Sequence, residues 1–139
     1  MSIQKIAIWI CFAFALTSCG QISRVDQCRS LMRVSGPKLS QQPTFKDFLE
    51  SDKAYLKGYE NILLIDIDLK QNRDKLVNYY KESVKLSQTM IDLGPAFDNN
   101  SLTDEQKQLV RNYAVNVVSK LPPLVNKSIE LCHTNSAKP

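Results

Sequence analysis

Residues 68–91 read DLKQNRDKLVNYYKESVKLSQTMI, and this stretch decides the fold. Its apolar residues return every three or four positions, which is the period of one face of an α-helix. We expect the helix to begin at Asp68, whose carboxylate can cap it with Gln71 three residues on. Gly94-Pro95 should end it. The apolar stripe consists of Leu69, Leu76, Val77, Tyr80, Val84 and Ile91.

Two helices are expected before this stretch. The first covers residues 22–34 and is ended by Gly36 and Pro37, since glycine suits the C-cap and proline cannot continue a helix. Its stripe puts Cys28 toward the interior, and residues 38–43 form a polar loop. The stripe residues are Ile22, Val25, Cys28 and Met32.

The second helix begins with a capping pattern, in which Asp47 follows Thr44 at the third position. Its apolar period continues as far as Leu63. Residues 64–69 partly alternate between apolar and polar side chains, as a strand would. A lone strand without a partner cannot satisfy its backbone hydrogen bonds, so we expect a connection between helices instead.

A fourth helix should start near Thr103, after a polar loop over residues 96–102. Pro122 and Pro123 fall inside it, and two prolines predict a kink or a break. Its stripe consists of Leu109, Tyr113, Val117, Leu121, Val125, Ile129 and Cys132. Short connections make antiparallel neighbours the default. The sequence therefore predicts an all-α protein, an up-down four-helix bundle with a kinked last helix.

The chain has four cysteines, and two of them should form a disulfide. Cys11 lies in an apolar leader and Cys19 directly after it, which leaves Cys28 and Cys132. In an up-down bundle the start of the first helix and the end of the fourth lie at the same end. Closing a loop this long would stabilise the fold by about 4–5 kcal/mol. The alternative is two separate buried thiols.

The N-terminal segment is built like an export signal, with Lys5 followed by an apolar run over residues 6–15. The run ends in Leu16-Thr17-Ser18-Cys19, which resembles the lipobox of bacterial lipoproteins. That resemblance implies cleavage before Cys19 and acylation of its thiol. A plain signal peptide with an incidental cysteine and a short membrane helix are the alternatives. We expect residues 1–18 to be the signal, 19–21 a short tether, 22–133 the bundle and 134–139 a disordered tail.

Composition narrows the possible functions. The formal net charge is +4, and no block of five or six like charges occurs, so a nucleic-acid partner is not expected. The single histidine, His133, excludes a multi-histidine metal centre. No nucleophile is paired with a base, so we expect neither an enzyme nor a cofactor.

The chain is also similar, in architecture alone, to small lipid-anchored four-helix proteins of bacterial envelopes, such as the extrinsic photosystem lipoproteins of cyanobacteria. The likeness covers the lipobox, the mature size and the helix pattern. It implies a non-catalytic envelope protein that acts by binding another envelope protein or complex. The alternative is a carrier of a small ligand or metal in a cavity between the helices. Gly20 after the lipidated cysteine implies the outer membrane, facing the periplasm, if the host is Gram-negative.

A protein partner should bind at the bundle end that lies away from the membrane anchor. We expect Lys38, Phe97 and Asp98 to contribute to that contact. Phe97 has an alternative role, in which its ring covers the end of the core. We interpret the tyrosines as residues of the core and its rim rather than as a ligand-binding surface. They are Tyr55, Tyr59, Tyr79, Tyr80 and Tyr113.

Overall fold

The computed structural model describes residues 22–133, apart from the side chains of Asp98, Val117 and Val118. The predicted signal, the predicted acylation site Cys19 and the predicted tail over 134–139 lie outside the described residues. Within the described part the protein is all-helical and contains no strand. Its helices are α2 (Arg24–Met32), α3 (Phe45–Glu60), α4 (Ile67–Asp92), α5 (Gly94–Asp98) and α6 (Asp104–His133).

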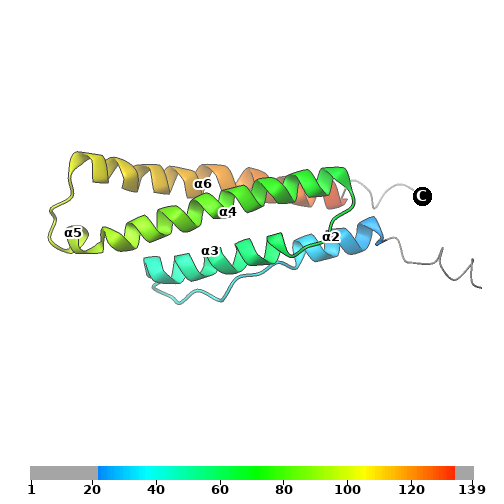
Figure 1. Cartoon of the computed structure of the whole chain (residues 1–139), viewed down its shortest axis with the longest axis horizontal. Coiled ribbons are helices and arrows are strands. Elements are labelled where there is room, and N and C mark those ends of the chain that lie inside the picture. Colours follow the sequence, from blue (N-terminus) through cyan, green and yellow to red (C-terminus); the bar gives the residue numbers. More distant parts are fainter. Residues whose placement is uncertain (1–21, 134–139) are drawn as a thin grey trace, which may run out of the picture.

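Helix α4 is the central element of the bundle (Figure 1). Both α3 and α6 run antiparallel to α4 and pack along it, while α2 packs on α6 and on α4. Helix α2 occupies the end of the molecule that α3 does not reach, so these two share one row of the bundle (Figure 1). The up-down four-helix bundle is therefore not confirmed. The first helix has only nine residues, and the chain after it runs beside α3 without helical structure.

Helix α2 is shorter than predicted, and of its predicted apolar stripe only Cys28 packs against the core. Val25 and Met32 are 65% and 50% exposed, whereas Gln27 and Leu31 are buried. Gln27 is buried because its side chain satisfies backbone groups of the α3–α4 connection. Its Oε1 accepts the N–H groups of Ile65 at 2.7 Å and of the next residue at 2.9 Å. A buried backbone donor without such a partner would be costly.

The capping pattern predicted for α3 is confirmed, since Thr44 and Asp47 form a reciprocal capping box. The predicted connection between helices before α4 is also confirmed, because residues 61–66 are neither helix nor strand. The predicted cap of α4 was wrong by two residues. Asp66, rather than Asp68, accepts the Leu69 N–H at 3.0 Å, so α4 begins earlier.

The prolines in the second half of the chain act only partly as predicted. Helix α4 ends before Gly94, but Gly94 and Pro95 then open the short helix α5 where a loop was expected. Helix α6 continues through Pro122 and Pro123, so a break into two helices does not occur. The residue after the prolines is held to α4, because Asn72 Nδ2 donates to the Leu124 carbonyl at 3.3 Å.

The predicted disulfide between Cys28 and Cys132 is confirmed, with their Cα atoms 5.6 Å apart. It joins α2 to the end of α6. The buried core lies beside it, centred on α4, and both cysteines pack against that core. The core consists of Leu31, Tyr59, Leu64, Leu69, Leu76, Tyr79 and Tyr80. The bundle thus has its covalent link at one end.

Candidate ligand-binding cleft

A cleft of about 510 Å³ lies between α3 and α6, with α4 as its floor. It forms because α3 and α6 each pack on α4 and barely on each other. Leu31 and Met32 of α2 line it as well. Its other lining residues include Phe48, Asp52, Tyr55, Tyr79, Tyr80, Ser83, Tyr113, Leu121 and Val125. This volume lies within the range of sites that hold small organic molecules.

Stacked tyrosine rings form one wall of the cleft, with Tyr80 at their centre. The ring of Tyr55 stacks on that of Tyr80 with centroids 5.2 Å apart, and Tyr59 stacks at 5.7 Å. Tyr79 meets Tyr80 edge-on at 5.0 Å. Burial raises the pKa of Tyr80, and it raises the pKa of Tyr79 to about 12. These phenols are therefore neutral at physiological pH.

Asp52 gives this aromatic cleft a carboxylate. Its Oδ2 accepts hydrogen bonds from the hydroxyls of Ser83 at 2.7 Å and Ser87 at 3.1 Å. Within residues 22–133 no lysine or arginine forms an ion pair with it, and its Oδ1 accepts no hydrogen bond. Burial raises the pKa of the Asp52 carboxyl, and the two hydroxyls partly oppose that rise. The cleft therefore holds a carboxylate whose charge is not paired with a lysine or arginine of the described residues.

Tyr113 of the cleft also belongs to an aromatic cluster near the start of α3. Phe45 at the start of α3 lies 6.2 Å from Phe97 and 6.1 Å from Tyr113, measured between ring centroids. The Tyr113 hydroxyl lies 3.4 Å from Ser87 Oγ, which extends the polar group around Asp52 toward this cluster. Tyr113 thus joins the polar group around Asp52 to Phe45, which does not itself line the cleft.

Helical spacing and a glycine place these side chains. Ser83 and Ser87 lie one turn apart on α4, on the face that also buries Tyr80. Gly36 lets the chain after α2 pass against α3, since a Cβ there would lie 2.6 Å from Tyr55 Cε2. The sequence analysis missed Asp52 and both serines. The usable signal was a pair of small polar residues within the apolar face of α4.

The three predicted partner residues lie in two segments, Lys38 after α2 and the other two in α5. Phe97 is half-buried in α5 against Phe45, which favours its alternative role as a cover for the core. Lys38 is exposed between α2 and α3 and forms no hydrogen bond or ion pair with a described residue. Asp98 is the last residue of α5. The proposed contact of these residues with a partner stays a prediction.

Metal-binding clusters and membrane-spanning helices are both absent from residues 22–133. Between residues 22 and 133, no three His, Cys, Asp or Glu side chains come close enough to hold a metal ion. No helix in the same range has the length and apolar character needed to span a membrane. His133 is exposed at the end of α6, next to the disulfide.

Comparison with known proteins adds no relationship. No protein family, curated protein or solved structure matches the chain at a significant level.

Proposed function

We propose that this chain is an exported, lipid-anchored binding protein that holds a small organic cation in the cleft between α3 and α6. The observation that carries the proposal is Asp52, a half-buried carboxylate without a basic partner among the described residues, set beside stacked tyrosines. Of the two functions expected from the sequence, the cleft favours the small-ligand carrier.

The ligand class follows from the chemistry of the cleft. A carboxylate taken partly out of water is stabilised by an opposite charge. An ammonium group that approached the free Oδ1 of Asp52 would supply that charge. Tyrosine rings attract cations through their faces and also give apolar contact to the body of a ligand. The best-fitting ligand is therefore an amine with an aromatic or aliphatic body.

Binding of an envelope protein is the second candidate function. It is supported by the open cleft itself, since α3 and α6 lie apart on α4 where a further helix could pack. An amphipathic helix of a partner would then place its apolar face in the cleft. The ammonium of a lysine on such a helix could reach Asp52, so charge alone does not separate the two candidates.

A pair of probes of similar shape tests the small-ligand proposal. Phenethylamine is cationic at neutral pH, and 2-phenylethanol is its neutral counterpart. Titration calorimetry on the wild type should detect the amine and show at least about tenfold weaker binding of the alcohol. Asp52→Asn should remove that preference. Asp68→Asn is the control, because Asp68 is exposed in the first turn of α4 and does not line the cleft.

Two results would contradict this proposal. One is equal affinity of wild type and Asp52→Asn for the amine. The other is failure of both probes to bind, together with a stoichiometric protein that co-purifies with the wild type from mild detergent. The second result would support the protein-binding candidate instead.

The lipid anchor needs its own test. Cys19→Ser should abolish incorporation of a radiolabelled fatty acid, because the acyl chains require that thiol. Equal label on the wild type and the variant would show that Cys19 is not the site of acylation.

A further inference from the structure

Large aliphatic side chains are exposed at the end of the molecule where the described chain begins. Ile22 is 37% exposed and Val25 is 65% exposed at the start of α2. Leu63, Ile65 and Ile67 are 69%, 60% and 71% exposed in and after the α3–α4 connection. We call these five residues the apolar end. Scattered exposed aliphatics are ordinary, but such a group at one place marks a contact surface.

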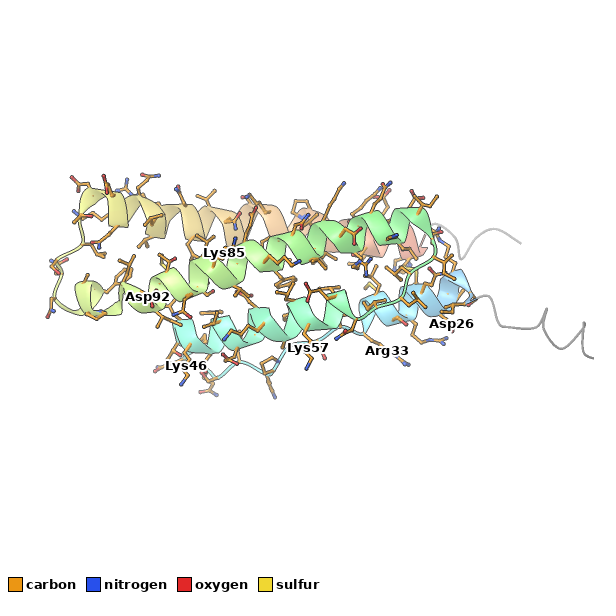
Figure 2. All side chains as sticks on the ribbon, viewed as in Figure 1. Asp26, Arg33, Lys46, Lys57, Lys85 and Asp92 are labelled. Atoms are coloured by element: carbon orange, nitrogen blue, oxygen red, sulfur yellow. A yellow bond between two sulfur atoms is a disulfide. The ribbon has the colours of Figure 1, made fainter. Side chains whose placement is uncertain are left out.

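Hydrogen bonds and packing hold these residues together. Gln27 donates to the Ile22 carbonyl at 3.0 Å and accepts the Ile65 N–H at 2.7 Å, so it joins the two segments. Ile22 and Leu63 line the same surface hollow. An ion pair between Arg24 and Asp66 ties α2 to the residue before Ile67. Figure 1 shows the starts of α2 and α4 at one end of the bundle, and Figure 2 shows Asp26 of α2 at that same end.

The disulfide makes this end rigid as well. Cys28 lies one turn after Arg24 in α2, and its bond to Cys132 fixes α2 to the end of α6. The apolar end is therefore a surface of fixed shape rather than a set of loose side chains. A fixed surface loses little conformational entropy when it is covered.

The position of the expected anchor identifies what covers this surface. Cys19 precedes Ile22 by three residues, and three residues span at most about 11 Å when fully extended. An acylated Cys19 would therefore keep Ile22 within that distance of the bilayer interface, and the rest of the apolar end would face the same side. Charged side chains of both signs border it: exposed Arg33 lines the same hollow as Leu63, exposed Lys70 lies one turn after Ile67, and exposed Asp26 and Asp68 follow Val25 and Ile67. The aliphatic side chains and the nearby anchor, rather than charge, therefore point to a lipid surface.

We propose that the apolar end is a membrane-contact face, whose aliphatic side chains enter the lipid interface beside the acyl chains of Cys19. The bundle is then attached to the bilayer in two ways, by the acyl chains on Cys19 and by the apolar end itself. The α5 end of the bundle points away from the membrane. This orientation depends on acylation of Cys19 and is independent of what the cleft binds.

A single tryptophan can report the contact, because the only tryptophan of the chain is Trp9, within the predicted signal. Ile65→Trp in the mature acylated protein places a fluorophore on the apolar end. Leu109→Trp is the matched control, since Leu109 is an exposed aliphatic near the start of α6, at the other end of the bundle. Each variant is reconstituted in vesicles of phosphatidylcholine and phosphatidylglycerol, with and without brominated acyl chains.

The expected result is emission from Ile65→Trp that shifts to the blue and is quenched by the brominated lipid, with no quenching of Leu109→Trp. Equal quenching of both variants, or of neither, would overturn the proposal. A blue shift that occurs without vesicles and tracks formation of a dimer would also overturn it, because a second copy would then cover the surface. Mass spectrometry that shows an unmodified Cys19 would remove the anchor and overturn it too.

A second measurement uses mature Cys19→Ser protein, which has no acyl chains. Replacing both Leu63 and Ile67 with Asp should lower its partitioning into the same vesicles at least about tenfold, since two exposed aliphatic side chains lose their transfer into lipid. Replacing Leu109 and Val115 with Asp is the control and should leave partitioning within about twofold of the parent. A loss of similar size in the control pair would contradict the assignment of the surface.

Discussion

Gly58 marks a close contact between α3 and the chain that follows α2. A Cβ added at this position would lie 2.7 Å from Val34 Cγ1, which is well inside van der Waals contact. Alanine in the interior of a helix is favoured over glycine by about 1 kcal/mol. Overpacking of a close contact costs about 1–3 kcal/mol, with a central value near 2. We therefore expect Gly58→Ala to lower the free energy of unfolding by about 1 kcal/mol.

A double-mutant cycle with Val34→Ala separates the two effects. Once the valine methyl groups are gone, Gly58→Ala should become stabilising by about 1 kcal/mol, which leaves a coupling energy of about 2 kcal/mol. Gly94→Ala is the control, because a Cβ there meets no atom within 4 Å, and it should stabilise by about 0.4–1 kcal/mol.

Urea unfolding followed by far-ultraviolet circular dichroism, with the disulfide intact, measures all of these variants. The close approach would be refuted if Gly58→Ala stabilised the wild type as much as it stabilises Val34→Ala. In that case α3 and the segment after α2 would not pack as the structure has them.

Four other outcomes are expected. Replacing both Cys28 and Cys132 with Ala should lower the free energy of unfolding by about 4–5 kcal/mol and raise the urea m-value, because the unfolded chain loses a long covalent loop. The Asp52 carboxyl has a folded-state pKa above its ordinary value of 3.8, so the stability that it contributes is present below that pH and is lost as pH rises through the folded pKa. Asp52→Asn should thus gain stability relative to wild type as pH rises toward neutrality in thermal melts. The side-chain N and O atoms of buried Asn116 have no hydrogen-bond partner among the described residues, so Asn116→Leu should raise the free energy of unfolding by about 1–2 kcal/mol. Phe97→Ala should lower the free energy of unfolding by about 2 kcal/mol and leave co-purification of any protein partner unchanged. Loss of that partner at an unchanged melting temperature would instead support Phe97 as a partner contact.

Local signals predicted much of the fold. Thr44 and Asp47 predicted the start of α3, because a capping box is made by residues three apart and needs nothing from the rest of the chain. The pairing of Cys28 with Cys132 followed from counting the cysteines that an exported protein would have left. Both the capping box and the disulfide could be predicted from residue types and their spacing alone.

Predictions failed where distant segments decide the structure. The stripe of α2 was largely misassigned because burial of Gln27 depends on backbone donors at Ile65 and Asp66, which lie far along the chain. Without knowledge of that contact, Val25 and Met32 are better candidates for the core than a glutamine. The position of α2 at the end of the row that it shares with α3 also depends on distant segments, because α2 packs against α4 and α6.

The cleft was not predictable for a related reason. Asp52 on α3 and Ser83 on α4 each resemble ordinary surface residues, and only the antiparallel packing of the two helices joins them. The tyrosines were predicted as core and rim residues, which Tyr59, Tyr79 and Tyr80 are by burial. Their position along an open cleft depends on the separation of α3 from α6, which no local pattern encodes.

The bond between Cys28 and Cys132 also sets an order of events during synthesis. A ribosome makes the chain from its N-terminus at about 5–20 residues per second, so Cys28 exists for about 5–20 s before its partner, 104 residues later, has been made. The antiparallel pair of α3 and α4 is complete by then and can form first. Helix α2 can already contact α4 and the α3–α4 connection, but its disulfide must wait for the end of α6, which is made last. The first helix of the finished bundle is therefore locked in place only after the last one has been made.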